Sequence, residues 1–502
     1  MSNYLNDLNV DQQKAVIQIN GASMVIAGAG SGKTRVLTYK IVHLLKNGIS
    51  PFNILSLTFT NKAAKEMRNR IEKIVGGQFS RSLWMGTFHS IFSRILRAEA
   101  EKINFPKNFT IYDTADSKSL IKSIIKELNL DKEIYKVGTI QNRISTLKNN
   151  FNTPKGYNNH PELLESDKKS KRTEFGRIYL MYVQRCFKAG AMDFDDLLIN
   201  TYKLLSDFPE VLNKYQKKFQ YILVDEYQDT NHIQYLIIKK LAALNENICV
   251  VGDDSQSIYA FRGANIQNIL NFKIDYPDYT LYKLEQNYRS TKNIVQAANS
   301  LIKHNEKQIE KDVWTHNTKG DSIIICETST DNDEGRLIAN TIKDLISESN
   351  FKDFSVLYRT NAQSRSLEES LRKLSIPYKI YGGLSFYQRK EIKDILSYFR
   401  MSINPKDEEA LKRIINYPSR GIGLTTFQKL LITANDNNIS IWEVISELEK
   451  YNVKLNSGTK KKLSDFAILI KSFMAQIESV DAYKLAEHIC KVTGIYSLLN
   501  SD

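Results

Sequence analysis

AGAGSGKT, residues Ala27–Thr34, decides the fold of this 502-residue chain. It follows the apolar run Ser23–Ile26 and precedes apolar residues at helical spacing, so it predicts a strand, a glycine-rich turn and a helix. Glycines let successive backbone N–H groups converge on an anion, and the helix N-terminus adds partial positive charge. Lys33 would then reach the β- and γ-phosphates of a nucleoside triphosphate, and the Thr34 hydroxyl would bind Mg²⁺. Phosphate loops usually open with Gly, and Ala27 fits that place if its φ is negative.

Composition bounds the class of protein. With 42% hydrophobic and 25% charged residues, the chain is typical of globular proteins, and no apolar run approaches the roughly 20 residues of a membrane span. The polar N-terminus excludes a secretory signal, and four scattered cysteines indicate thiols of a reducing compartment, so a cytoplasmic protein is expected. The formal charge of +14 favours a polyanionic partner, although many cytosolic proteins are basic without one.

A second apolar run, Tyr221–Val224, ends in an acidic pair. Asp225 would hold Mg²⁺ through water, and Glu226 would orient and deprotonate an attacking water. An acidic pair after a strand is common by itself. Together with the upstream phosphate loop, it predicts a hydrolytic site at the carboxyl edge of a parallel sheet.

Two further strand ends carry polar and aromatic residues. Ile54–Thr58 is followed by Phe59 and Asn61, where core packing is the commoner use of a lone aromatic. Asn247–Val251 is followed by a segment that contains, in order, Gln256, Tyr259, Phe261 and Arg262. Its amide could contact a γ-phosphate, while its rings and guanidinium could stack on bases.

The rest of the chain alternates between helical blocks and a second α/β rhythm. From Ile91 to about Gly190 the sequence is helical and Lys-rich, with Asp167–Arg172 expected as an exposed loop. Further strands are expected at Ser322–Cys326, Phe354–Leu357 and Tyr378–Tyr381. After them the chain becomes mostly helical.

These segments together resemble superfamily 1A helicases of the UvrD/Rep/PcrA type. The resemblance rests on an ordered series that spans nearly the whole sequence: LNVDQQ, AGAGSGKTR, TFTNKAA, GTFHS, MDFDDL, VDEYQDTN, VGDDSQSIYAFRGA, LEQNYRST, VLYRTNAQSR and GGLSFYQRKEIKD. It implies an α/β fold with two RecA-like P-loop motor domains, the second incomplete, each carrying a mainly helical insertion. The implied domains are 1–90 with 190–279 (first motor), 91–189 (its insertion), 280–383 (second motor) and 384–502 (accessory insertion).

The resemblance also implies roles for individual residues. The catalytic set would be Lys33, Glu226, Gln256 and Arg289, the last an arginine finger from the second motor. Nucleotide contacts would come from Gln12, Ala27, Gly28, Ala29, Gly30, Ser31, Gly32, Lys33, Thr34, Arg35 and Tyr288, with Mg²⁺ on Thr34 and Asp225. A single-strand DNA track would include Phe59, Asn61, Tyr259, Phe261, Arg262 and Arg359. Relatives carry Trp at the position of Phe261, which offers a smaller stacking area.

The implied function is that of an ATP-dependent DNA helicase and translocase. It would use ATP and Mg²⁺ to move 3′→5′ on single-stranded DNA and to unwind duplexes from single-strand/double-strand junctions. It would act in DNA repair or replication, with proteins of those processes as partners and no membrane. Two late family motifs, TLHxAKGLEF-like and YVxxTRA-like, have no match, so the sequence is interpreted as an N-terminal portion of a longer protein. If the protein ended at Asp502, hydrolysis-driven unwinding would not be expected.

Three alternatives remain open at this stage. One is the motor part of a helicase–nuclease subunit, and another is a non-unwinding, ATP-gated DNA-binding protein. The third is a P-loop kinase of small molecules, which would explain Lys33 and Asp225 but not the aromatic and arginine segments.

Overall fold

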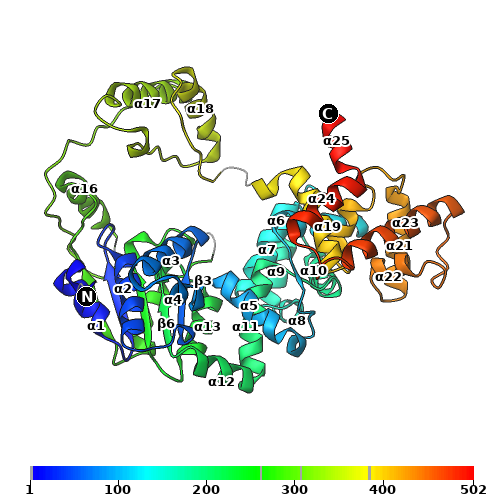
Figure 1. Ribbon diagram of the computed structural model, residues 1–502, viewed down its shortest axis with the longest axis horizontal. Coiled ribbons are helices and arrows are strands. Elements are labelled where there is room, and N and C mark those ends of the chain that lie inside the picture. Colours follow the sequence, from blue (N-terminus) through cyan, green and yellow to red (C-terminus); the bar gives the residue numbers. More distant parts are fainter. Residues whose placement is uncertain (1–3, 261–262, 306–307, 383–385, 502) are drawn as a thin grey trace. The chain divides into compact units, whose positions relative to one another are not determined.

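The computed structural model describes residues 4–260, 263–305, 308–382 and 386–501 (Figure 1). The chain divides into two compact units, one formed by Met1–Gly320 with Ser397–Asp502 and the other by Asp321–Leu396. Each unit buries apolar clusters of its own. None of the described helices combines the length and apolarity that crossing a membrane requires.

A six-stranded parallel sheet forms the centre of the first unit. Its strands, in spatial order, are β3 (Trp84–Thr87), β2 (Ile54–Thr58), β6 (Tyr221–Val224), β7 (Ile248–Gly252), β1 (Ser23–Ala27) and β8 (Thr280–Leu284). Strands β1, β2 and β7 are buried throughout, as expected for apolar runs in a parallel sheet covered on both faces. In β1, Met24 and Ile26 join one apolar cluster, whereas Val25 and Ala27 join the other.

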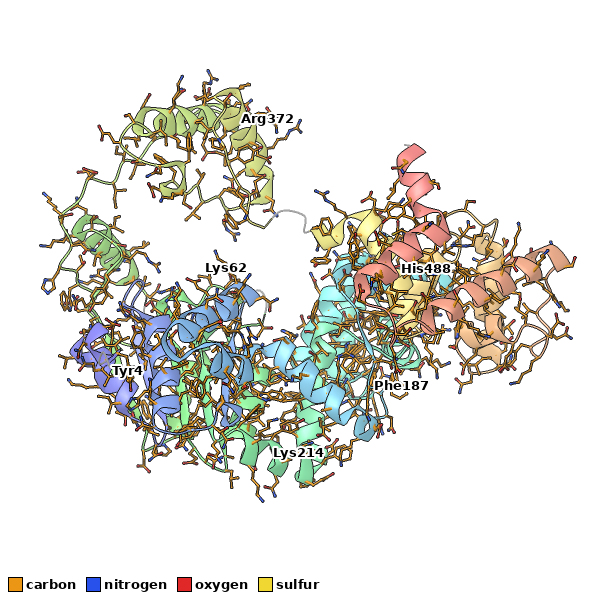
Figure 2. All side chains as sticks on the ribbon, viewed as in Figure 1. Tyr4, Lys62, Phe187, Lys214, Arg372 and His488 are labelled. Atoms are coloured by element: carbon orange, nitrogen blue, oxygen red, sulfur yellow. The ribbon has the colours of Figure 1, made fainter. Side chains whose placement is uncertain are left out.

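Helices cover both faces of this sheet. They are α1 (Val10–Ile17), α2 (Lys33–Lys46), α3 (Asn61–Val75), α4 (Gly77–Ser82), α5 (Phe88–Glu99), α11 (Phe194–Asp207), α12 (Pro209–Lys218), α13 (His232–Ala242), α14 (Gln267–Leu270) and α15 (Phe272–Asp275), whereas α16 (Lys292–Ile302) follows β8. Figure 2 shows the described side chains, with Lys62 labelled on α3 and Lys214 on α12. Helices α1, α2 and α3 contribute to the cluster that contains Val25, and α5, α11 and α13 to the opposite one.

Strand β8 extends this sheet beyond its predicted boundary. The domain prediction ends the first motor at Tyr279, but Thr280–Leu284 pairs in parallel with β1, from Ser23 opposite Thr280 to Ala27 opposite Leu284. β8 is an edge strand whose side chains are mostly exposed except for Leu284. The first sheet therefore takes up a strand that the sequence pattern assigned to the second motor.

The second unit forms helices but not the predicted strands. Helices α17 (Asp331–Leu345) and α18 (Ser364–Lys373) pack through a small cluster that contains Ala339 and Leu371. Within the described residues, the segments predicted as strands at 322–326, 354–357 and 378–381 have no β-ladder. A parallel strand needs a neighbour to satisfy its backbone groups, and here none lies beside them.

A helical block interrupts the first unit between β3 and β6. It contains α6 (Thr114–Glu127), α7 (Val137–Asn149), α8 (Pro154–Asn158), α9 (Pro161–Lys169) and α10 (Phe175–Lys188), with a two-stranded ladder of β4 (Thr110–Ile111) and β5 (Ala191–Met192). The predicted exposed loop at Asp167–Arg172 is wrong at its start. Asp167 lies in α9, is buried, and accepts hydrogen bonds from Arg143 Nη2 (2.9 Å) and Tyr157 Oη (3.1 Å). A buried partner cannot be inferred from a run of charged letters.

The Asp-rich start of α11 anchors this block to the motor. Asp193 is the N-cap of α11, and its side chain accepts the Asp196 amide. Lys148 of α7, buried to 2% exposure, lies 2.7 Å from both Asp193 Oδ2 and Asp196 Oδ1. Burial and the neighbouring Asp193 raise the pKa of Asp196 to about 7, against the lowering effect of Lys148.

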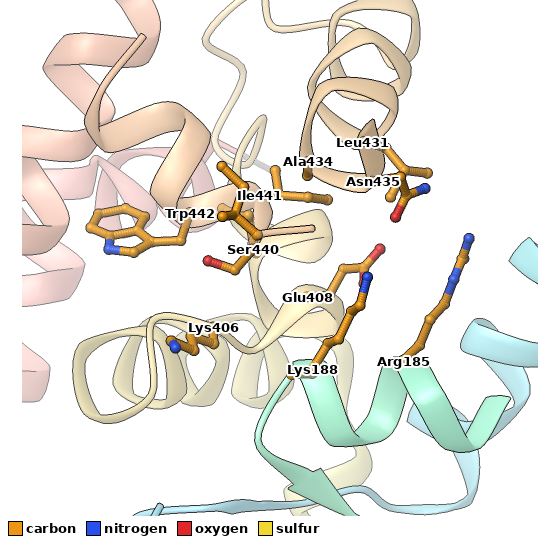
Figure 3. Close-up of a pocket in the computed structure, with 13 residues that line it drawn as sticks. Arg185, Lys188, Lys406, Glu408, Leu431, Ala434, Asn435, Ser440, Ile441 and Trp442 are labelled. Carbon is orange, nitrogen blue, oxygen red and sulfur yellow. The ribbon is translucent and has the colours of Figure 1, made fainter. Parts of the chain in front are cut away.

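Helices fill the C-terminal part of the chain, and those nearest its start contact the helical block. The helices of this part are α19 (Lys390–Ile403), α20 (Glu408–Ile414), α21 (Leu424–Asp436), α22 (Ile441–Ser446), α23 (Ser457–Met474), α24 (Ala482–Thr493) and α25 (Ile495–Ser501). Arg400 contacts Asp116 of α6 (2.9 Å), and Asn404 donates to the Ala189 carbonyl (2.9 Å). Figure 3 shows the same contact region, where Arg185 and Lys188 of α10 face Glu408. Polar side chains therefore make much of this contact.

Candidate nucleotide-binding site

The predicted strand, turn and helix are present at residues 23–46. Between β1 and α2, φ is positive at Gly30 (74°) and Gly32 (95°), a conformation that favours glycine. Ala27 is the last residue of β1 and is not among the positive-φ residues, which explains how this loop accommodates alanine. Ser31 Oγ donates to the Gly28 carbonyl (2.7 Å) and closes the turn.

A cleft of about 360 Å³ opens over this turn. It is lined by Gln12, Ala29, Gly30, Gly32, Lys33, Thr34, Arg35, Arg70, Glu226, Gln256, Tyr288 and Arg289. All of these except Arg70 belong to the predicted nucleotide-binding or catalytic set. Arg70 lies on α3 and pairs with Glu66 (2.8 Å), a helical spacing that gives no hint of a role at the cleft.

Lys33 and Glu226 face each other across the cleft. Lys33 Nζ lies 3.3 Å from Glu226 Oε2, and among the described residues this ammonium is buried without a hydrogen-bond partner. Gln228 Nε2 donates to the same carboxylate oxygen (3.0 Å), and Glu226 itself has a left-handed backbone with φ of 49°. An ammonium that lacks acceptors is suited to phosphate oxygens.

Asp225 lies behind Glu226 and is buried to 3% exposure. Burial, and next the Glu226 charge, raise the pKa of Asp225 to about 7, although Lys33 acts to lower it. The same causes raise the pKa of Asp229 to about 6. These carboxylates and the Thr34 hydroxyl offer hard oxygen atoms, the kind of ligand that suits Mg²⁺.

The segment that carries Arg289 binds directly to the phosphate turn. Asn287 Nδ2 donates to the Ala29 carbonyl (2.6 Å), and the Tyr288 amide donates to the Gly30 carbonyl (3.0 Å). Asn287 Oδ1 accepts the Arg289 amide (2.8 Å). These contacts place Arg289 on the same cleft as Lys33 and Glu226, within the first compact unit, and its role as an arginine finger stays a prediction.

A Cβ at position 30 would collide with this segment. It would lie 2.8 Å from Asn287 Nδ2 and 2.9 Å from Arg289 Cβ, in addition to the strain of its positive φ. We expect Gly30→Ala to weaken binding of a fluorescent ATP analogue by roughly ten-fold or more, since overpacking costs about 1–3 kcal/mol. Gly48→Ala is the matched control, because Gly48 has φ of 83° but open space around its Cβ. Equal affinities of the two variants would contradict the close approach.

The amides predicted to contact the nucleotide are both engaged within the protein. Gln12 is buried, donates through Nε2 to the Ser31 carbonyl (3.0 Å) and accepts the Asn9 amide on Oε1 (3.2 Å). Gln256 Nε2 donates to Asp253 Oδ2 (2.6 Å). Asn9 Nδ2 also donates to Tyr288 Oη (2.7 Å), which ties the predicted base-stacking ring to the start of α1.

The predicted DNA-track residues are placed only in part. Phe59 is partly buried and packs edge-on against Phe88 at 5.5 Å between ring centroids, which agrees with the core use of this aromatic. Asn61 begins α3 and is exposed, and Tyr259 is 37% exposed. Phe261 and Arg262 lie outside the described residues. Arg359 is exposed in the second unit.

The fold and the cleft together define a P-loop nucleoside triphosphatase. The sequence matches two family models, the UvrD/REP helicase N-terminal domain over residues 8–277 and the UvrD-like helicase C-terminal domain over residues 282–501. The ATP-dependent DNA helicase PcrA of Staphylococcus aureus (strain Mu50) is 42% identical over 509 residues, covering 100% of this chain and 68% of that protein. PcrA of Staphylococcus epidermidis (strain RP62A) is 43% identical over 509 residues, which again cover 100% of this chain and 68% of that protein. The chain belongs to the UvrD/Rep helicase family.

The family assignment from ordered motifs is therefore confirmed. The prediction of an N-terminal portion that lacks the last two family motifs is not supported, because the C-terminal family model matches as far as residue 501. The small-molecule kinase alternative has no support from either match.

Proposed function

We propose that this chain couples ATP hydrolysis to 3′→5′ movement on single-stranded DNA and to duplex unwinding from single-strand/double-strand junctions. Family membership makes it an ATP-dependent DNA helicase. The observation that carries the proposal is the meeting of Lys33, Glu226 and Arg289 on one cleft. A role in DNA repair or replication, partner proteins of those processes and a cytoplasmic location belong to the same proposal.

The cleft residues divide the work of hydrolysis. Lys33 would bind the β- and γ-phosphates, and Glu226 would orient the attacking water and accept its proton. Arg289 would stabilise the charge that develops on the γ-phosphate in the transition state. Thr34 and Asp225 would hold Mg²⁺, which when bound neutralises phosphate charge. Loss of the γ-phosphate would remove the partner of Arg289. The conformation of residues 287–289 would therefore respond to which nucleotide is bound.

The DNA track would use aromatic rings and cationic side chains. Tyr259 and Phe261 lie on the same segment as Gln256, so a shift of Gln256 with nucleotide state would move the stacking residues. Arg262, Arg359 and Asn61 would contact the backbone and Phe59 a base. Stacking contributes about 1–3 kcal/mol per base without sequence preference.

The domain boundaries proposed from the sequence are kept with one change. The first motor would comprise 1–90 with 190–284, since β8 pairs with β1. The helical insertion would be 91–189, the second motor would continue to 383, and the accessory helices would occupy 384–502.

The test is hydrolysis of ATP by the purified chain with and without single-stranded DNA. We expect DNA to stimulate turnover at least roughly ten-fold, because alignment of an arginine finger can supply much larger factors. Affinity for DNA should fall steeply with added salt, since phosphate contacts release counterions. DNA binding that responds to ATP without stimulated turnover would instead favour the non-unwinding, ATP-gated alternative.

A further inference from the structure

Two adjacent aspartates after β7 are buried and paired with Lys311. The side chains of Asp253 and Asp254 are 3% and 0% exposed, and that of Lys311 is 7% exposed. Lys311 Nζ lies 3.0 Å from Asp253 Oδ1 and 2.6 Å from Asp254 Oδ1, and it also donates to Ser255 Oγ (2.8 Å). Removing one partner from such a buried group leaves an uncompensated charge, so Lys311 is needed wherever both carboxylates stay ionised.

Asp253 connects this cluster to the nucleotide cleft. Its Oδ1 faces Lys311, and its Oδ2 accepts Gln256 Nε2 at 2.6 Å. The backbone N–H of Gln256 also donates to the Asp253 carbonyl (2.9 Å), and Gln256 lines the cleft. The orientation of Gln256 therefore depends on a carboxylate that Lys311 holds in place.

The segment that contains Lys311 also contacts the segment that carries Arg289. The Asp312 amide donates to Glu285 Oε1 (3.0 Å). The Asn287 amide donates to the Trp314 carbonyl (2.7 Å), and Asn287 Oδ1 in turn accepts the Arg289 amide (2.8 Å). One short stretch of chain thus contacts Asp253, which accepts from Gln256, and Asn287, which accepts from the Arg289 amide.

We propose that Lys311 is a positioning residue for hydrolysis, which holds Gln256 through Asp253 and keeps it in register with the segment carrying Arg289. The inference rests on the proposed function and adds to it a residue that no motif of the sequence indicated. Lys311 does not line the cleft, so its effect should fall on turnover more than on nucleotide binding.

The test compares Lys311→Met with the double variant Lys311→Met/Asp254→Asn in the full chain. We expect Lys311→Met to lower kcat for ATP about 10- to 100-fold, as misplacement of a positioned group does, and to change the affinity for a fluorescent ATP analogue less than about three-fold. The double variant removes one charge of each sign, so its melting temperature should recover. Its kcat should stay low, because Asp253 still lacks its anchor.

A purely structural role gives a different pattern. If Lys311 only balanced buried charge, the double variant would regain kcat together with its melting temperature, and kcat within about two-fold of the unmodified chain would overturn the inference. The double variant carries the test if Lys311→Met fails to fold. Lys303→Met, at an exposed position eight residues earlier, is the control for loss of a lysine. An unmodified chain without turnover would instead overturn the proposed function.

Discussion

Replacement of Lys33 by alanine is expected to abolish DNA-stimulated ATP hydrolysis, with a loss of about 100-fold or more. Lys33 Nζ is the buried, acceptor-poor cation of the cleft, and its one ion pair among the described residues is with Glu226 at 3.3 Å. Truncation removes the positive charge that would meet the β- and γ-phosphates. It also removes the ion pair of Glu226 and the charge that acts to lower the pKa of Asp225, so affinity for a fluorescent ATP analogue should fall as well. Steady-state hydrolysis and fluorescence titration measure the two effects.

The matched control for this variant lies on the same helix. Lys46 is exposed in the last turn of α2, so Lys46→Ala removes the same side chain from the same element away from the cleft. It should leave turnover unchanged within about two-fold. Retained hydrolysis in Lys33→Ala would refute the assignment of the cleft as the nucleotide site.

Replacement of Glu226 by glutamine is expected to separate binding from hydrolysis. The change keeps the size of the side chain but removes the group that would accept a proton from water, which should lower kcat about 100- to 10,000-fold. ATP should still bind, because Lys33 loses a competing carboxylate and becomes free for phosphate oxygens. A single-turnover assay beside nucleotide titration shows whether the loss lies in the chemical step.

Glu101→Gln controls for the loss of a carboxylate. Its side chain is 77% exposed and paired only with Lys107 among the described contacts, so the isosteric change should leave hydrolysis unaffected. If Glu226→Gln turned over ATP at the normal rate, another residue would have to act as the base. Weaker ATP binding by the variant would argue that Glu226 has a structural role at the turn.

The parts of the fold with local signals could be predicted from the sequence. The apolar runs of β1, β2 and β6 indicate buried strands directly from their composition. The AGAGSGKT glycines indicate the turn, because a positive φ depends on the single residue that adopts it. Helix starts were equally local, as at Asp193, where a side chain caps its own helix. In such cases pattern and structure depend on the same few neighbours.

The misplaced elements depend on distant partners. The pattern of Thr280–Leu284 indicates a strand wherever it pairs, and only the free edge of β1 decides that it joins the first sheet. Asp167 can be buried because Arg143 and Tyr157 donate hydrogen bonds to its carboxylate. Charge runs and apolar runs hold no information about such neighbours.

The candidate site shows the same division. Motif residues such as Lys33, Glu226 and Arg289 line one cleft, and their catalytic roles stay predictions. Arg70 and Lys311 were missed because each belongs to a segment without a recognisable pattern, and their proximity arises from the folding of separate elements. A buried lysine between two motif aspartates is visible only once the chain is folded.

The strand-like segments of the second unit affect how the chain behaves in solution. Ile324, Ile325 and Leu357 are 83%, 93% and 92% exposed, on backbone that has no ladder among the described residues. Apolar, extended backbone of this kind is a template onto which another molecule can add a strand. At low ionic strength the formal charge of +14 keeps copies apart, whereas salt screens that repulsion. Colloidal stability should therefore decline as salt and protein concentration rise together.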